Sequence, residues 1–365
     1  MMRSATALGS LAVLVLALLL GGALRFPDLG LKPMHTDEAV QAAKFIEAKD
    51  TGRYRYDPAE YHGPTLPLFS LLVVGEPSES ALRRVPVLFS LGMLLLLPGL
   101  RDGLGRWECA VAGVLLAVSP MFVYYSRYYI HESLLVFFTL AVMVSGWRYA
   151  VRAHWGWAVL AGMGIGLMHA TKETCIMAYA AMLAGVLAQR RRLPIRHLAA
   201  GLVAALVVSV VLFSWFFTNP FGPLDSIWTY ASYLVRSEGS GHEKPWYYYG
   251  WLMFFHRDAS GAVWSEGLIL ALAVAGMVRA RRECLPLPRF LALYTVVIAA
   301  IYSVIPYKTP WLAMNILLGA ALLAGVGMVA VLRGLRRPPL QAVAIACFVL
   351  ASAQLVQQSH RAGFR

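Results

Sequence analysis

Two neighbouring carboxylates, Asp37 and Glu38, follow the first long apolar run of the sequence. They open an amphipathic stretch that reaches Lys49, and the preceding Thr36 is a common helix N-cap residue. The two acids could simply complement the positive end of that helix. Their place just outside an apolar run favours a second role, as a base or a cation site in front of a lipid headgroup.

Two further polar segments could bind an anion. His62 stands in a Tyr-His-Gly-Pro segment, where an imidazole can hold a phosphate oxygen or make a structural hydrogen bond. Arg127, His131 and Glu132 share a short segment with four tyrosines. The tyrosines suit an aromatic belt at a membrane surface. The three ionisable side chains are costly beside apolar runs unless they pair or face a polar cavity.

Lys172 and Lys308 lie in two short breaks between apolar runs, Thr-Lys-Glu-Thr and Pro-Tyr-Lys-Thr-Pro-Trp. Each could be a lysine that snorkels to a membrane surface. All six lysines of the chain, however, fall on the same predicted side of the membrane. Because a compact ammonium group is a good partner for phosphate, these two lysines join the candidate phosphate ligands.

The elements that must position these residues are membrane-spanning helices. Hydrophobic residues make up 59% of the 365 residues and charged residues only 14%, which excludes an ordinary water-soluble domain. A helix needs about 20 apolar residues to cross a membrane core. Eleven runs approach this length, near residues 8–24, 86–100, 108–124, 134–147, 156–170, 174–189, 198–217, 262–278, 290–305, 311–332 and 339–356.

Three smaller features complete the pattern. The run 8–24 resembles a signal peptide as well as a span, and we expect a retained span because many others follow. The stretch Thr65–Val74 has only ten residues and contains Pro67, so we expect it to lie in the membrane interface. The four cysteines have no metal-like spacing and are expected to be free thiols.

The charges predict which ends of the spans share a side. With eleven spans and an inner N-terminus, the inner loops carry sixteen basic and three acidic residues, which accounts for the whole net charge of +13. The outer loops hold the other sixteen basic and sixteen acidic residues. This asymmetry follows the positive-inside rule, so no nucleic-acid partner is expected. The candidate residues all fall outside, together with the long loops 25–85 and 218–261.

We therefore expect an all-α polytopic membrane protein of about eleven transmembrane helices, with interfacial helices in its first outer loop. Residues 1–365 should form one integral-membrane domain, with no internal repeat and no separate soluble domain. Its expected location is the cytoplasmic (inner) membrane, with the site facing the periplasm or exterior.

The order of these motifs resembles the GT-C glycosyltransferases, in particular the branch of protein O-mannosyltransferases and lipid A aminoarabinose transferases. That family has an acidic pair after its first span, a proline-containing interfacial segment, a Ser-Arg turn followed by an acid, and a Thr-Lys after the fifth span. The counterparts here are Asp37-Glu38, His62-Gly63-Pro64, Ser126-Arg127 with Glu132, and Thr171-Lys172. With its Pro-Tyr-Lys-Thr-Pro-Trp segment, the chain looks most like a subgroup linked to archaeal N-glycosylation and flippase activity. Glu132 stands where the family more often has aspartate.

The resemblance implies an inverting hexosyl- or pentosyltransferase that moves a sugar from a polyprenyl-phosphate donor to an acceptor hydroxyl of a glycan, lipid or protein. Asp37 would be the general base. Glu38 and Glu132 would orient the acceptor or, with Asp37, hold a divalent cation such as Mg or Mn. A lipid-linked-sugar flippase or transporter and a non-catalytic subunit of a glycan-assembly complex stay as alternatives. The residues expected to meet the departing phosphate are His62, Arg127, His131, Lys172 and Lys308.

Overall fold

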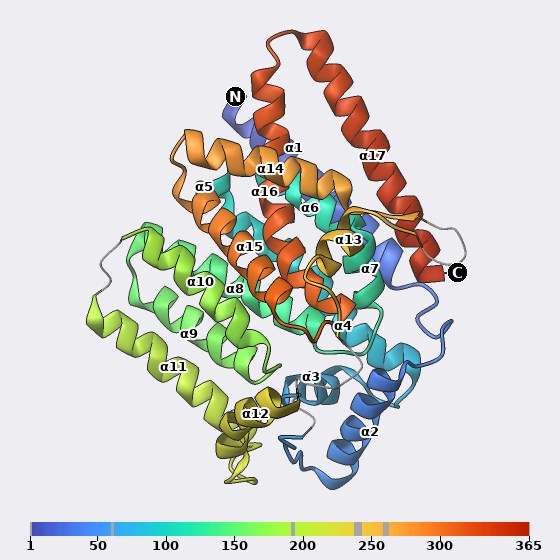
Figure 1. Cartoon of the computed structure of the whole chain (residues 1–365), viewed down its shortest axis with the longest axis vertical. Helices are drawn as coiled ribbons and strands as arrows, with labels where there is room; N and C mark the ends of the chain where they lie inside the picture. Colours follow the sequence, from blue (N-terminus) through green and yellow to red (C-terminus); the bar gives the residue numbers. More distant parts are fainter. Residues whose placement is uncertain (1, 60–61, 191–193, 237–242, 258–262, 365) are drawn as a thin grey trace.

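Helices form almost all of the regular structure in Figure 1. The structure is a computed structural model, and it describes residues 2–59, 62–190, 194–236, 243–257 and 263–364. The elements up to the middle of the chain are α1 (Met2–Arg25), α2 (Thr36–Thr51), α3 (Thr65–Val73), α4 (Glu79–Leu96), η1 (Leu97–Leu100), α5 (Arg101–Leu104), α6 (Arg106–Val118), α7 (Pro120–Ser126), α8 (Glu132–Arg152) and α9 (Trp155–His169). The later elements are α10 (Cys175–Ala188), α11 (Ile195–Phe213), α12 (Gly222–Arg236), α13 (Tyr248–Phe254), β1 (His256–Arg257), β2 (Val263–Trp264), α14 (Gly267–Arg282), α15 (Pro286–Val304), η2 (Pro310–Leu312), α16 (Ala313–Gly334) and α17 (Pro338–Phe364).

The core of the bundle is α16, which is buried continuously over residues 313–329 and packs against α14, α15 and α6. At its crossing with α14, a Cβ on Gly327 would lie 1.8 Å from the Leu272 carbonyl oxygen. A Cβ on Gly276 would lie 2.1 Å from the Leu323 carbonyl oxygen. Because no side chain fits at either position, glycine lets the two helices meet through their backbones.

Each predicted span has a helical counterpart, and the predicted all-helical membrane fold is confirmed. Among the described residues, seven helices are long and apolar enough to cross a membrane, and the bent pair α6–α7 makes an eighth if it counts as one span. The helices α9, α10 and α14 have 15, 14 and 16 residues, which is short of the usual spanning length. The count of eleven therefore stays a prediction.

The predicted span 108–124 is broken in the middle. α6 and α7 meet at Ser119 and Pro120 with a bend of 57°. Proline has no N–H to donate to the preceding turn and its ring crowds that turn, so a kink or break is favoured at Pro120. The Glu266 Oε1, just before α14, accepts hydrogen bonds from the Ser119 hydroxyl (2.7 Å) and the Met121 N–H (2.9 Å). The break is therefore held by a carboxylate from a distant part of the chain.

Two predicted boundaries on the outer side are wrong. α4 begins at Glu79, two turns before the predicted run 86–100, because a serine side chain caps it there. Arg83 consequently lies inside a helix. The N-cap of α2 is His35, and Thr36 is the first helical residue. Both corrections bear on the site, because Arg83 and His35 take part in it.

α1 packs into the bundle against α6 and α4. Its last residue, Arg25, is buried and donates hydrogen bonds to the carbonyl oxygens of Leu116 (2.9 Å) and Ala117 (2.7 Å). These carbonyls lie in the last turn of α6, where the helix break leaves them without intrahelical partners. A cation at that end of a helix is also favoured by the helix dipole.

The loops predicted to be inside meet at one end of the bundle. Arg148 pairs with Asp102, and Arg279 and Arg333 each pair with Glu108 at 3.3 Å. The helices α2, α3 and α12 lie together at the lower end of Figure 1, away from the α16–α17 turn at the top. The two sets of loops therefore gather at different ends, as the charge asymmetry predicts. Which end faces the cytoplasm stays a prediction.

Three smaller expectations also have outcomes. α3 has nine residues and is too short to span, as expected. The four cysteines are free, as predicted, with Cys109 and Cys175 buried and Cys284 and Cys347 exposed. In the second predicted outer loop, 218–261, residues 237–242 and 258–261 lie outside the described residues, and the described part holds α12, α13 and β1, which pairs with β2 just past the loop.

Candidate active site

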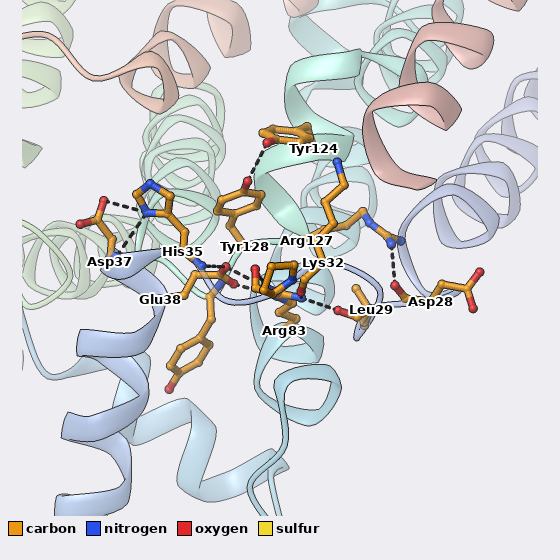
Figure 2. Close-up of polar contacts among 12 residues, drawn as sticks. Asp28, Leu29, Lys32, His35, Asp37, Glu38, Arg83, Tyr124, Arg127 and Tyr128 are labelled. Carbon is orange, nitrogen blue, oxygen red and sulfur yellow. Dashed lines mark hydrogen bonds and ion pairs between the residues drawn. The ribbon is translucent and has the colours of Figure 1, made fainter. Parts of the chain in front are cut away.

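Glu38 is fully buried at the start of α2 and uses both carboxylate oxygens. Arg83 of α4 donates from Nε to Oε1 (2.7 Å) and from Nη2 to Oε2 (2.8 Å). Oε1 also accepts the Tyr129 N–H (2.8 Å), and Oε2 accepts the His35 N–H (3.0 Å). Figure 2 shows Arg83 reaching this carboxylate. With all four donors in place, Glu38 joins three segments of the chain and has no oxygen left for a substrate.

Asp37 faces a different environment. Successive residues of a helix point about 100° apart, so adjacent side chains look in different directions. The Asp37 side chain is 47% exposed, against 0% for Glu38, and Figure 2 shows it turned away from Arg83. Its Oδ2 lies 3.7 Å from the Nδ1 of His35. The same Nδ1 accepts the Asp37 N–H at 3.3 Å, so the carboxylate of Asp37 keeps its lone pairs available.

Arg127 is surrounded by carbonyl groups. Its guanidinium donates four hydrogen bonds of 2.7 to 3.3 Å and lies 4.4 Å from the centre of the Phe364 ring. It thereby ties the α7–α8 turn to the segment after α1, as Figure 2 shows for Asp28, and to the end of α17. This geometry fits a structural role, and the predicted role as a phosphate ligand stays untested. The four carbonyl acceptors belong to Arg25, Pro27, Asp28 and Gly363.

Lys172 and Glu132 form an ion pair between the α9–α10 turn and the start of α8. The side chains are 9% and 1% exposed. Burial lowers the pKa of Lys172, but the carboxylates of Glu132 and Glu173 outweigh this effect and hold that pKa above its ordinary value. The Lys172 ammonium is therefore charged. It has three N–H donors, of which one is directed at Glu132.

His62 and His131 lie beside this ion pair. Their ring centroids are 5.0 Å apart, and His62 forms an isolated backbone bridge with Lys172. The His131 Nε2 donates to the Gly63 carbonyl oxygen at 3.1 Å. Its buried Nδ1 has no hydrogen-bond partner within the described ranges. Burial and, second, the charge of Lys172 lower the pKa of His131 to about 3, so this ring is neutral at physiological pH.

A close backbone contact brings these groups together. The Gly63 N–H donates to the Thr171 carbonyl oxygen (3.0 Å), and the Thr65 N–H donates to the Ala170 carbonyl oxygen (3.1 Å). A Cβ on Gly63 would lie 2.1 Å from the Ala170 carbonyl oxygen. Only glycine allows this approach of the α3 segment to the α9–α10 turn.

The segment between α15 and η2 adds Lys308. This lysine is buried, and its Nζ donates to the Ile305 carbonyl oxygen. The neighbouring Tyr307 lies within reach of charges from two parts of the site, Lys172 and Asp37. Burial raises the pKa of Tyr307, and the charges of Lys172 and Asp37 also act on it. The structure thus brings Asp37, the lysine ion pair and the Lys308 segment into one region.

Glu173 is a second buried carboxylate in this region. Burial raises the pKa of Glu173 to about 7, against the lowering effect of Lys172. Its Oε2 has no hydrogen-bond partner in the part of the chain that the structure describes. A carboxyl group with this pKa is partly protonated at neutral pH.

The predicted cation site is not assembled. Glu38 is occupied by four donors, Glu132 by Lys172, and Asp37 stands apart from both. Among the described residues, no group of three His, Cys, Asp or Glu side chains is placed to hold a metal ion. These carboxylates therefore do not form the octahedral oxygen shell of Mg. The use of a divalent cation stays an untested prediction.

Reasoning from the sequence missed two members of this region, His35 and Arg83. The structure shows a capping box, in which Glu38 accepts the N–H of His35 three residues before it. The spacing of three residues between His35 and Glu38 is the pattern in the sequence that could have predicted this contact of His35. Arg83 gave no such signal, because its partner Glu38 lies 45 residues away.

A family model described as dolichyl-phosphate-mannose-protein mannosyltransferase matches residues 65–215. This range runs from α3 to just past α11 and contains Arg127, Glu132 and Lys172. No curated protein matches the chain in sequence.

Three solved structures have a similar fold. ArnT from Cupriavidus metallidurans bound to undecaprenyl phosphate has a TM-score of 0.68 at 18% identity, over 96% of this chain and 64% of that one. Its apo form has a TM-score of 0.67 at 18% identity, over 90% and 60%. The Archaeoglobus fulgidus oligosaccharyltransferase in complex with Zn and sulfate has a TM-score of 0.64 at 16% identity, over 96% and 52%. The chain thus spans less than two thirds of the length of each.

Proposed function

Because the chain has the fold of the GT-C glycosyltransferases, we propose that it transfers a hexose or pentose from a polyprenyl-phosphate donor to an acceptor hydroxyl at the outer end of the bundle. The match to a mannosyltransferase family model supports the reaction class. The undecaprenyl phosphate bound to ArnT supports the choice of donor. The acceptor is a glycan, lipid or protein outside the cytoplasmic membrane.

The contrast between Asp37 and Glu38 carries the proposal. Glu38 is saturated by donors, whereas the Asp37 carboxylate is 47% exposed and lies 3.7 Å from the acceptor nitrogen of His35. A general base must be reachable by the substrate and must have free lone pairs. Of the two neighbouring acids, only Asp37 meets both conditions.

In the proposed reaction, Asp37 accepts the proton of the acceptor hydroxyl as its oxygen attacks the anomeric carbon. The bond between that carbon and the phosphate oxygen breaks, and its electron pair stays on the phosphate. Attack opposite the phosphate inverts the anomeric centre. The protonated Asp37 then returns its proton to water.

The departing polyprenyl phosphate gains negative charge, which donors in a water-poor site stabilise. Lys172 is the best placed, because it is charged, 9% exposed and has two donors besides the one directed at Glu132. Lys308 and His62 are further proposed phosphate ligands. In the same scheme, Glu132 holds Lys172 in position, and the neutral His131 supports the histidine beside it.

The test measures donor binding and sugar transfer separately. Full-length protein in nanodiscs is given a polyprenyl-phosphate-linked radiolabelled sugar and membranes from cells that lack the protein as the source of acceptor. Asp37→Asn should lower transfer by about 10²- to 10⁴-fold, because a general base contributes that much. Donor affinity should stay close to that of the native protein.

Glu38→Gln serves as the comparison on the neighbouring residue. It leaves Arg83 without its counterion, so it should lower the free energy of unfolding by an amount on the order of 3–5 kcal/mol. Unchanged transfer by Asp37→Asn would remove Asp37 as the base. Donor binding without turnover by the native protein would favour a non-catalytic subunit, and donor movement between leaflets would favour a flippase.

A further inference from the structure

A polar cavity of about 500 Å³ lies at the outer end of the bundle, between α2, the segment 52–58 and α12. Its charged lining has three cations and three acids. Within the described residues, Glu47, Arg53, Arg55 and Asp225 form no ion pair. These four side chains, two of each sign, thus face a shared space without pairing with one another. The six charged lining residues are Lys44, Glu47, Arg53, Arg55, Asp57 and Asp225.

Two buried tyrosines form a fixed floor for the cavity. The Tyr54 hydroxyl donates to the His62 carbonyl oxygen (2.9 Å), and its ring packs on Trp215 with centroids 5.5 Å apart. The Tyr56 hydroxyl lies 2.6 Å from the Thr229 hydroxyl oxygen. These contacts hold both rings in place, so part of the lining is fixed, while the charged side chains around the rings are exposed or half-buried.

The wall formed by α12 is amphipathic. Asp225 and Thr229, four residues apart, lie on one side of the helix, where Asp225 lines the cavity and Thr229 meets Tyr56. Ile227 and Trp228 are 65% and 68% exposed. A helix with an apolar exposed face next to membrane spans suits the membrane interface. The cavity therefore opens at the level where a membrane-bound acceptor presents its headgroup.

The cavity borders the candidate active site. The charge of Lys44, which lines the cavity, reaches His131. Tyr54 contacts the backbone of His62, whose ring lies 5.0 Å from that of His131. A ligand in the cavity would thus lie next to the proposed phosphate ligands. It would contact α2, the helix whose first turn holds Asp37.

We propose that this cavity binds the hydroxyl-rich sugar headgroup of a saccharide acceptor, an inference that rests on the proposed glycosyltransferase function. A sugar hydroxyl donates to a carboxylate and accepts from a guanidinium. A lining with equal numbers of both charges suits such a ligand better than a phosphate, which needs an excess of donors. The volume lies within the range of ordinary small-molecule sites, roughly 300–1,000 Å³.

The experiment uses full-length protein in nanodiscs and two soluble probes, chitotriose and mannotriose, with an octapeptide rich in serine and threonine as the competing class. Saturation-transfer NMR measures probe binding, and a filter assay measures polyprenyl-phosphate binding. The test variant carries Glu47→Gln and Asp225→Asn together. Asp50→Asn is the matched control, because it removes a charge from the same helix α2 at an exposed position outside the lining.

At least one trisaccharide should bind to the native protein and to the control. The double variant should bind it at least about tenfold more weakly, the loss expected for charge-assisted hydrogen bonds. Its melting temperature and polyprenyl-phosphate affinity should not change. Equal affinity in the double variant, binding of the peptide alone, or binding of neither trisaccharide would overturn the proposal.

These outcomes separate the two proposals. If the trisaccharide binds as expected and the native protein transfers no sugar, the proposed function fails while the saccharide site stands. If the native protein transfers sugar and the double variant binds and uses the acceptor normally, the cavity proposal alone fails.

Discussion

Asp37 and Glu38 differ in environment because α2 turns Glu38 toward Arg83 and Asp37 toward His35. The sequence predicted that both acids belong to the site, since their place after the first span does not depend on distant contacts. It could not predict which acid stays available. That depends on Arg83, which lies 45 residues further along the chain. The pairing of Lys172 with Glu132 could not be predicted from the sequence for the same reason, because the two residues are 40 positions apart.

Glu173 should make stability depend on pH. Its pKa rises from 4.5 to about 7 in the folded protein, so the folded state binds this proton more tightly than the unfolded chain. The resulting stabilisation is complete below the unfolded pKa and is lost as the pH rises through 7. Between pH 5 and pH 8, we expect the free energy of unfolding of the native protein to fall by up to about 3 kcal/mol relative to that of Glu173→Gln. The melting temperature should fall with it.

Thermal unfolding in detergent across this pH range is the measurement. Glu76→Gln is the control, because the Glu76 side chain is 98% exposed and should leave the slope unchanged. Parallel curves for the native protein and Glu173→Gln would contradict the prediction.

The helices themselves follow from the apolar runs, because each run must satisfy its backbone hydrogen bonds internally in a membrane. The ends of the helices do not follow from hydropathy. α4 begins two turns before its apolar run, where Ser78 caps the helix and Arg83 is paired and buried. α6 ends at Val118, next to Ser119, where Glu266 supplies an acceptor from the residue just before α14. Polar residues with distant partners therefore decide where these elements begin, end and bend.

The contact of the α3 segment with the α9–α10 turn should fail when Gly63 gains a side chain. Gly63→Ala places a Cβ 2.1 Å from the Ala170 carbonyl oxygen, so the backbones must separate. We expect a loss of roughly 1–3 kcal/mol in stability and weaker polyprenyl-phosphate binding. Gly75→Ala is the control, because a Cβ there meets nothing within 4 Å. Equal melting temperatures for the two variants would show that the contact is dispensable.

At the scale of the whole molecule, the uneven distribution of charge along the sequence predicts two distinct ends. The ion pairs among the loops that are predicted to be inside agree with this. The GT-C fold predicted from the order of motifs is confirmed. The closer likeness to the archaeal subgroup stays a prediction, as does the orientation in the membrane. Orientation depends on the lipid and the insertion machinery, neither of which is encoded in contacts within the chain.

The orientation can be tested with a native cysteine. Cys284 is exposed in the loop between α14 and α15, which the positive-inside rule places in the cytoplasm. In a Cys347→Ser background, a membrane-impermeant maleimide should label Cys284 only after the cells are permeabilised. A cysteine introduced as Asp50→Cys in the same background should be labelled in intact cells. The reverse pattern would place the proposed site in the cytoplasm.

The position of Arg127 has a consequence for the order of assembly. Its carbonyl acceptors come from residues 25–28, which are made before Arg127, and from Gly363 of α17, 236 residues after Arg127. Until α17 is made, the guanidinium therefore has only its early partners. The corner beside the acidic pair closes only when α17 arrives.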